Sequence, residues 1–424
     1  MQVGIPMDSP DQMLEGSPID RLVYTGLLVV GLAVLIRRGR QVGKLLRNNG
    51  PILLFFFYCA LSLFWSDFPG VAFKRWTKAV GDLVMVLVVL SDREPTAAIK
   101  RLLARTTYLL IPLSVLFIKY YPVLGKGYGR WDWKPFYTGV TMNKNTLGVI
   151  CLFSGLGAAW RLIAAYRDRE AERRKPQLIV QGLILAMVLW LFWMADSMTS
   201  LACFLIASAL LMAMASRRLV RKTVLVHTLV AGVIIVSVSV LFLGLDPGVL
   251  ATMGRNPTLT DRTEVWSVIL GIAANPWFGT GFESFWLGPR LDKIWSIYSW
   301  HPAEAHNGYI EVFLNLGWIG VALLAFVIAI GYRTIISAYR QNSPTSSLRL
   351  AFFVVGVVYN FTEAAFFRMM APAWIFFLLA ITSFPEPSRQ VIRTLAPNSA
   401  PDDCTADVRQ TSGSLSAVFI SGNL

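Results

Sequence analysis

The sequence predicts an all-α, polytopic integral membrane protein with about eleven (10–12) transmembrane helices and one large periplasmic loop. The 424 residues are 55% hydrophobic and only 15% charged, whereas an ordinary soluble domain carries about 25% charged residues. The mean hydropathy is +0.55. The apolar runs are continuous over about 17–22 residues, as transmembrane helices require, whereas barrel strands would alternate over about 10 residues.

These runs divide the chain into parts that we take in order. We expect an N-terminal tail (1–21), eight transmembrane helices (22–244), the large loop with short amphipathic helices (245–305), three more transmembrane helices (306–385) and a disordered cytoplasmic tail (386–424). The last assignment rests on the Ser, Pro, Asp and Asn content of the tail. The expected spans are 22–37, 51–66, 76–91, 101–119, 145–165, 178–195, 198–215, 223–244, 306–331, 350–366 and 370–385.

The net charge of +14 is explained by topology rather than by nucleic-acid binding. Alternate short loops are basic, which is the positive-inside pattern of cytoplasmic loops. Alternation then places 66–75, 120–144, 245–305 and 367–369 on the outer face. The basic residues are Arg37, Arg38, Arg40, Lys44 and Arg47, then Arg167, Arg169, Arg173, Arg174 and Lys175, then Arg217, Arg218, Arg221 and Lys222.

His306 is the first candidate for chemistry, because it opens an apolar helix directly after the large loop. Asn307, Glu311 and Asn315 follow at a spacing of four residues, which puts them on one helix face. A glutamate one turn into a membrane helix is costly unless it faces a cavity or a partner. Gly317 and Gly320 would permit close helix packing nearby. The alternative is that His306 and Asn307 only cap the helix.

Arg262 is the second candidate, with Trp266 one turn later on a short amphipathic helix expected over 262–273. On the outer membrane surface Arg262 could bind a phosphate group. The alternative is a surface ion pair with Asp261 or Glu264. The stretch Asn275-Pro276-Trp277-Phe278-Gly279-Thr280-Gly281 is a helix stop and turn in either case.

A second outer-face cluster contains Arg130 among aromatic residues, and Lys144 and Asn145 at the start of a span. Tyr and Trp at such positions commonly form the interfacial belt, although Trp also stacks on sugar faces. Lys144 is either a snorkelling anchor or a second phosphate ligand. We treat Arg130, Lys144 and Asn145 as candidate substrate-binding residues, together with Asn307, Glu311 and Trp266.

The sequence predicts no metal site and no cofactor. His301, Glu304 and His306 match no zinc spacing. An Asp-x-Asp motif, which a metal-bound phosphosugar site of the soluble kind would use, is absent from the outer segments.

These motifs resemble those of the O-antigen ligase/polymerase superfamily of bacterial membrane glycosyltransferases, over about residues 50–370. His306-Asn307 followed by Gly317-x-x-Gly320 resembles the motif that marks the superfamily, and Arg262-x-x-x-Trp266 with the Asn275-Pro276 turn looks like its large periplasmic loop. Three further stretches look more like the exopolysaccharide polymerase branch: Leu63-Phe64-Trp65-Ser66, 139–148 and Asn360-x-Thr362-Glu363.

The resemblance implies a metal-independent enzyme of the inner membrane that uses undecaprenyl-diphosphate-linked glycans. It implies catalytic roles for His306, as base or orienting group at the acceptor hydroxyl, and for Arg262, with Lys144 sharing the charge of the leaving diphosphate. Two departures stand out. Related ligases carry an arginine where this chain has Ser197–Ser200, and the polymerase branch often has His-Lys-Asn where this chain has Asn143-Lys144-Asn145.

The expected function is therefore polymerisation of lipid-linked oligosaccharide repeats on the periplasmic face. The expected partners are the lipid-linked donor and acceptor, the lipid bilayer and a chain-length-regulating co-polymerase, with no nucleic acid. A ligase that transfers the glycan to lipid A core or to a protein is the nearest alternative. A flippase or transporter is an alternative of another class, which would predict two similar halves and charges at mid-membrane depth.

Overall fold

The structure is a computed structural model that describes residues 18–128, 135–167, 174–215, 223–242, 258–273, 275–369 and 371–385. Residues 1–17 of the predicted N-terminal tail, and the predicted C-terminal tail from 386 onward, lie outside these ranges. Arg130, one of the predicted substrate-binding residues, also lies outside the described residues.

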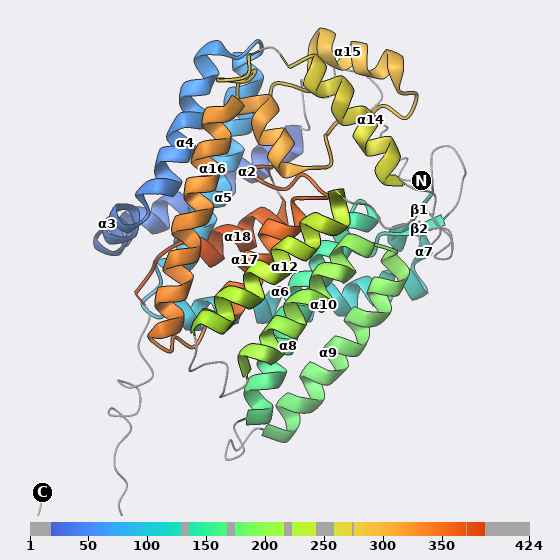
Figure 1. The fold of residues 1–424 in the computed structure, drawn as a ribbon. Coiled ribbons are helices and arrows are strands. Elements are labelled where there is room, and N and C mark those ends of the chain that lie inside the picture. Colours follow the sequence, from blue (N-terminus) through green and yellow to red (C-terminus); the bar gives the residue numbers. More distant parts are fainter. Residues whose placement is uncertain are drawn as a thin grey trace, which may run out of the picture.

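The described part of the chain is helical apart from one small antiparallel ribbon, which confirms the all-α class (Figure 1). The ribbon pairs β1 (Lys126–Tyr128) with β2 (Pro135–Tyr137). The helices before it are α2 (Pro18–Arg37), α3 (Gly39–Asn48), α4 (Gly50–Leu61), the 3₁₀ helix η1 (Ser62–Trp65), α5 (Pro69–Leu90), α6 (Pro95–Tyr120) and α7 (Pro122–Gly125). Those after it are α8 (Lys144–Arg167), α9 (Arg174–Ala195), α10 (Met198–Ala215), α12 (Thr223–Phe242), α14 (Thr258–Gly271), α15 (Gly288–Ile297), α16 (Gly308–Arg340), α17 (Ser346–Tyr359) and α18 (Pro372–Ile381).

Within the described residues, five helices are long and apolar enough to cross a membrane: α6, α8, α9, α10 and α16. A sixth span results if α2 and α3, which meet at a bend of 99°, are counted as one. Shorter apolar helices of 10–17 residues are α4 with η1, the part of α12 from Thr223 to Ser239, α17 and α18. The chain is thus a multi-pass membrane protein, but the predicted count of eleven spans is not confirmed. The span predicted over 76–91 lies within α5, which belongs neither to the long apolar helices nor to the shorter ones. Helix α5 carries four charged residues, Lys74, Arg75, Lys78 and Asp82.

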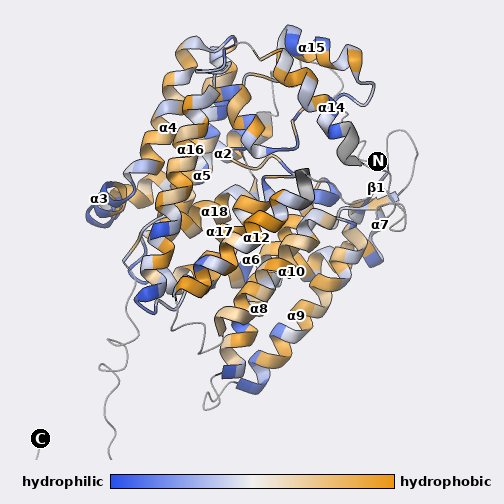
Figure 2. Cartoon of the chain, in the orientation of Figure 1, coloured by the Kyte–Doolittle hydropathy of each residue, from blue (hydrophilic) through white to orange (hydrophobic). Residues whose placement is uncertain are grey.

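Helix α17 lies at the centre of the bundle. All its residues from Leu348 to Tyr359 are buried, and it packs against α10, α16 and α18. Figure 2 shows hydrophobic residues over the surfaces of the helices and hydrophilic residues gathered at helix ends. Apolar side chains that point outward, such as Ile179 (70% exposed) and Met212 (62% exposed), are what a lipid-facing surface requires.

The predicted span 350–366 is too long, because α17 ends at Tyr359. The side-chain oxygen of Asn360 accepts hydrogen bonds from the backbone N–H groups of Ala365 (2.9 Å) and Phe366 (2.8 Å). These bonds close a turn, so the chain leaves the helix and forms a loop before α18. Because the helix ends there, Glu363 lies in a loop next to the start of α16, where the N–H of Gly308 donates to the carbonyls of Asn360 and Glu363.

Helix α16 is broken at Gly317, where φ is 65° and ψ is −167°. The loop between α14 and α15 fills the break. The N–H of Trp318 donates to the carbonyl of Pro276 at 2.8 Å, and the N–H of Gly281 donates to the carbonyl of Asn315 at 2.9 Å. Backbone groups that the break leaves without helical partners are therefore satisfied by the loop.

The close neighbour of Gly317 is loop backbone rather than a second helix, which corrects the packing role predicted for it. A Cβ atom at Gly317 would overlap the carbonyl group of Trp277. A Cβ atom at Gly279 would lie 2.5 Å from the carbonyl oxygen of Asn315. The Asn275-Pro276 turn and the glycines on both sides of the contact thus join the loop to the broken helix.

Helices α14 and α15 lie side by side at one end of the molecule, and they share a small apolar core (Figure 1). Val265, Trp266 and Ile269 of α14 pack with Leu291 and Ile294 of α15. The first turns of α16 join the same cluster. The segment that carries Arg262 is consequently packed onto the start of the helix that follows His306.

Candidate functional site

His306 lies at the junction between the α14–α15 region and α16, in a left-handed backbone conformation with φ of 49°. The next residue, Asn307, is the N-cap of α16: its side-chain oxygen accepts from the N–H groups of Tyr309 (3.0 Å) and Ile310 (3.1 Å). These are two of the donors that a helix start leaves without partners. Asn307 is 3% exposed, so the capping alternative describes Asn307, whereas the ring of His306 makes different contacts.

The backbone on both sides of His306 is fixed. Ala305 is held by two side chains predicted to bind substrate: its carbonyl accepts from the Nε1–H of Trp266 at 2.8 Å, and its N–H donates to Glu311 Oε1 at 2.5 Å. On the other side, the N–H of Gly308 donates to the carbonyl of Asn360 at 2.8 Å. A Cβ atom at Gly308 would overlap the side chain of Asn360, so this contact requires glycine.

The polar stripe predicted along α16 is present, and its contacts are with the protein backbone and one tryptophan. Glu311 accepts from the Nε1–H of Trp286 at 2.9 and 3.0 Å, and the amide of Asn315 donates to Glu311 Oε2 at 3.3 Å. The side-chain oxygen of Asn315 accepts from the N–H groups of Ser284 (2.9 Å) and Phe285 (3.1 Å). The stripe therefore supports the loops around His306.

Two carboxylates face one ring nitrogen of His306. Its Nδ1 lies 3.1 Å from Glu304 Oε1 and 3.5 Å from Glu363 Oε2. Neither oxygen is aligned for a straight hydrogen bond to a buried Nδ1, and poorly aligned catalytic hydrogen bonds are common before substrate binds. Nδ1 is buried while 26% of the side chain is exposed, so the accessible part of the side chain consists of atoms other than Nδ1.

Each carboxylate is paired with an arginine. Arg262 Nη2 lies 3.8 Å from Glu363 Oε1, and its Nη1 donates to the carbonyl of Thr362 at 2.6 Å. Arg368, from the loop after α17, forms an ion pair with Glu304 Oε2. Arg262 thus pairs with Glu363, which is far away in sequence, rather than with its neighbour Glu264. The structure brings both predicted catalytic residues, Arg262 and His306, into one charged cluster.

Further charge lies beside this cluster. Burial lowers the pKa of the Arg368 guanidinium; the negative charge of Glu283 raises it and the positive charge of Arg75 lowers it. Arg75 reaches over from α5 and donates to the backbone carbonyl of Glu283. Cations from three separate parts of the chain, Arg75, Arg262 and Arg368, therefore lie in or beside this cluster of carboxylates.

Glu304, His306 and Glu363 offer one ligand atom each within 4.8 Å of one another, which is a donor set that a divalent cation could use. Both carboxylates are ion-paired with arginines in this structure. The arginines contact Glu304 Oε2 and Glu363 Oε1, the oxygens that do not face Nδ1, so positive charge is already present beside both carboxylates.

The other predicted residues lie apart from these contacts. Lys144 pairs with Asp196, with 3.6 Å between Nζ and Oδ2, and Asn145 is exposed. The link to the site is indirect: Thr199, close to Asp196 in sequence, accepts a hydrogen bond from the hydroxyl of Thr362 at 3.3 Å. Lys144 and Asn145 therefore occupy the same end of the bundle without a recorded contact to His306.

Sequence reasoning missed the roles of three residues. Glu304 was considered only as a metal ligand, Glu363 only as part of a motif, and Arg368 not at all. The available signal was charge: Glu304 and Arg368 lie in segments that topology places on the same outer face as His306, and Glu363 lies close to the outer end of a predicted span.

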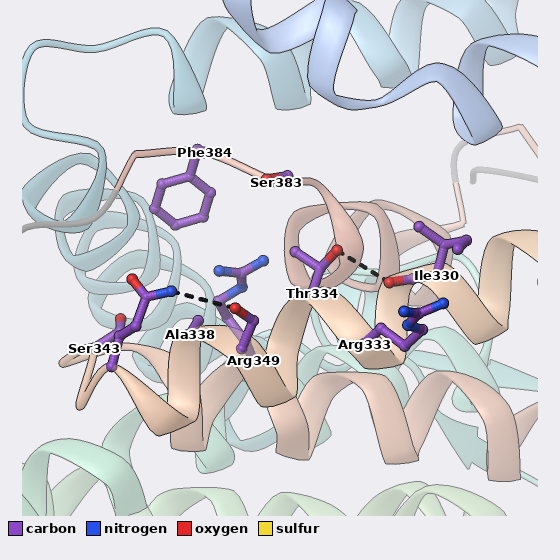
Figure 3. Close-up of a pocket in the computed structure, with 10 residues that line it drawn as sticks. Ile330, Arg333, Thr334, Ala338, Ser343, Arg349, Ser383 and Phe384 are labelled. Carbon is purple, nitrogen blue, oxygen red and sulfur yellow. Dashed lines mark hydrogen bonds between the residues drawn. The ribbon is translucent and has the colours of Figure 1, made fainter.

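A cavity of about 350 Å³ lies elsewhere, at the far end of α16 (Figure 3). Arg333 and Gln341 of α16 line it together with Arg349 of α17. Arg349 donates to the carbonyls of Ala380 and Thr382, both at 2.9 Å, and so caps the end of α18. Roughly 35 Å of helix separates this cavity from His306, and it does not belong to the charged cluster.

Comparison with known proteins agrees with the resemblance seen in the sequence. Residues 182–325, which include Arg262 and His306, match the sequence model of a family described as O-antigen ligase. The chain is 23% identical over 288 residues to the exopolysaccharide production protein ExoQ of Rhizobium meliloti (strain 1021). The match covers 66% of this chain and only 64% of the length of that relative. The chain is a multi-pass membrane protein in which residues 182–325 are similar to a family described as O-antigen ligase, and it is distantly similar to a protein of exopolysaccharide production.

Proposed function

We propose that this protein is a glycosyltransferase of the bacterial inner membrane, with its active site facing the periplasm. It would polymerise undecaprenyl-diphosphate-linked oligosaccharide repeats into exopolysaccharide or O-antigen. The observation that carries the proposal is the environment of His306, whose buried Nδ1 faces two carboxylates while 26% of the side chain is exposed. Arg262 forms an ion pair with one of these carboxylates, that of Glu363.

The proposed step is a single displacement. The acceptor hydroxyl oxygen forms a bond to the anomeric carbon of the donor sugar, and the bond between that carbon and the diphosphate oxygen breaks. His306 Nε2 takes the hydroxyl proton, and the electron pair of the broken bond stays on the leaving diphosphate. The configuration at the anomeric carbon is then inverted.

Arg262 is suited to stabilise the leaving diphosphate. Its Nη2 is 3.8 Å from Glu363, a loose pair that a phosphate oxygen can replace with a shorter, charge-assisted hydrogen bond. Its Nη1 is anchored on the carbonyl of Thr362, which keeps the guanidinium close to His306. Positive charge held where negative charge develops is often the largest single contribution to catalysis.

The two predicted catalytic residues are tested by complementation in a strain that lacks this protein. We expect Arg262→Ala to lower the yield of long polymer by about 10²–10³-fold, the usual effect of losing one group that stabilises developing negative charge. Arg262→Lys should recover part of the loss, because it restores a point charge without the second donor. Lys293→Ala, an exposed cation of α15, is the matched control, and all variants are compared at equal membrane abundance.

The products distinguish the possible functions. Single lipid-linked repeats that accumulate on the periplasmic side support polymerisation. A ligase is the second candidate, because the matching family is described as O-antigen ligase. It predicts long polymer that stays on the lipid carrier and does not reach its final acceptor. Repeats trapped on the cytoplasmic side would indicate a flippase, and normal polymer from Arg262→Ala would remove Arg262 from the mechanism.

Chelation provides a separate test. If Arg262 and Arg368 supply the positive charge, EDTA should leave polymerisation by the purified protein within about twofold of the untreated rate, since a bound metal is typically worth several kcal/mol. Washed protein assayed with EDTA, and again with Mg²⁺ or Mn²⁺ added, gives the comparison. Activity that disappears with EDTA and returns with a metal would reassign Glu304, His306 and Glu363 as ligands.

A further inference from the structure

Glu304 and Glu363 each lie between His306 and an arginine, and Glu304 is the nearer of the two to the ring. Its Oε1 lies 3.1 Å from His306 Nδ1, and its Oε2 is paired with Arg368. We propose that Glu304 is a positioning residue, anchored by Arg368, that holds His306 through Nδ1 so that Nε2 meets the acceptor hydroxyl. This inference rests on the proposed function of the site.

A positioning role requires that the ring be oriented by its side-chain contacts, and the backbone around it provides this condition. The carbonyl of Ala305 accepts a hydrogen bond from Trp266, and its N–H donates to Glu311. The N–H of Gly308 donates to the carbonyl of Asn360. The Cα atom of His306 is therefore fixed from both directions. Only rotation about the side-chain bonds remains, and Glu304 Oε1, 3.1 Å from Nδ1 without an aligned hydrogen bond, is the nearest group that can restrict it once the pair aligns.

Arg368 in turn is held by its neighbours. The preceding residue, Phe367, is 3% exposed and has φ of 57°. Its ring stacks on Phe55 of α4 with 3.7 Å between ring centroids and lies 4.1 Å from Trp374 of α18. The loop that presents Arg368 is thereby fastened to two helices, so the arginine is a firm support for Glu304.

The two arginines of the cluster pair with different carboxylates. Arg262 lies 3.8 Å from Glu363 Oε1, whereas Arg368 is paired with Glu304 Oε2. Arg368 therefore pairs with the carboxylate that is nearer to His306 Nδ1, which is the contact through which it would support the base.

A carboxylate against Nδ1 also selects the useful tautomer. When Nδ1 carries its proton toward a carboxylate, Nε2 is left with a lone pair and can accept a proton from substrate. The charged groups around the ring are Glu304, Glu363, Arg262 and Arg368. When Nε2 takes a proton, the positive charge on the ring lies beside the carboxylate of Glu304.

The experiment uses the purified full-length protein in detergent with a lipid-linked oligosaccharide repeat as substrate, and measures kcat and KM separately. We expect Glu304→Gln to lower kcat by at least about 10²-fold, because an amide can donate to Nδ1 and stabilise the wrong tautomer. KM for the lipid-linked repeat should stay within about threefold of wild type. Glu304→Asp should recover at least about tenfold of the lost kcat, because it restores the carboxylate.

Arg368→Lys and Arg368→Gln test the anchor. The lysine variant keeps a charge for Glu304 and should retain most of kcat, whereas the glutamine variant should lose about tenfold, roughly the effect of one hydrogen bond to a charged group. Glu264→Gln is the matched control, because Glu264 is exposed on α14. Thermal unfolding of each variant identifies any that fail to fold, and the Asp and Lys substitutions then carry the test.

The outcomes separate this inference from the proposed function. If His306→Ala abolishes turnover while Glu304→Gln stays within threefold of wild-type kcat, the positioning role is wrong and the base assignment stands. A raised KM with unchanged kcat in Glu304→Gln would also overturn the inference, because it would make Glu304 a substrate-binding group. If His306→Ala turns over like wild type, the proposed chemistry itself is wrong.

Discussion

Replacing His306 with alanine is expected to lower the rate of polymerisation by about 10²–10⁴-fold, the usual contribution of a positioned general base. The protein should still fold, because the side chain of His306 is 26% exposed and the helix cap belongs to Asn307. The measurement is single-turnover transfer by purified protein, with thermal unfolding recorded in parallel. A rate within threefold of wild type would contradict the role assigned to His306.

His301→Ala is the control for this prediction, because it removes a histidine from the same segment. His301 has a similar backbone conformation, with φ of 51°, and its ring stacks on Trp295 with 4.7 Å between centroids. We expect its activity to stay close to that of wild type. Equal losses from the two variants would mean that the segment matters for folding rather than for proton transfer.

Gly317→Val is expected to remove most of the folded protein from the membrane. Valine at φ of 65° is strained, which costs about 1–2 kcal/mol, and its Cβ would overlap the carbonyl group of Trp277. Overpacking typically adds about 1–3 kcal/mol, so the expected destabilisation is about 2–5 kcal/mol, a large part of the stability of most domains. Membrane abundance and the midpoint of thermal unfolding in detergent measure it.

Gly271→Ala is the matched glycine substitution. Gly271 ends α14, and a Cβ atom there would meet nothing within 4 Å. Because alanine favours helix over glycine by up to about 1 kcal/mol, this variant should be as stable as wild type or slightly more stable. If Gly317→Val were equally stable, the loop between α14 and α15 would not be joined to α16 as described.

The fold class and the two central residues could be predicted from the sequence because their signals are local. Apolar runs read directly as membrane helices, and the motifs around Arg262 and His306 each lie within a short stretch. The contacts that Arg262 and His306 both make with Glu363 could not be predicted. Glu363 reaches both of them from a loop that hydropathy assigned to a membrane span, because aromatic residues such as Phe361 and Phe366 made the loop look apolar.

The roles of the polar stripe were also beyond the sequence. Spacing correctly placed Glu311 and Asn315 together, since periodicity fixes which residues share a helix face. Their contacts with Trp286 and with the N–H groups of Ser284 depend on the break at Gly317, and the sequence shows a glycine there without showing which backbone approaches it. Spacing thus predicts a face, whereas the partner on that face depends on tertiary structure.

The position of Ala305 has a consequence for mutagenesis. Its methyl group makes no part of the proposed chemistry, yet its carbonyl and N–H are the two groups by which Trp266 and Glu311 hold the segment before His306. A scan that truncates side chains to alanine would pass over this residue, because it is already alanine. The scan would instead assign the effect to Trp266 and Glu311, which could then be mistaken for groups that touch the sugar. Replacing the amide of Ala305 with an ester, by semisynthesis or nonsense suppression, would remove the N–H alone and reveal the backbone as part of the machinery.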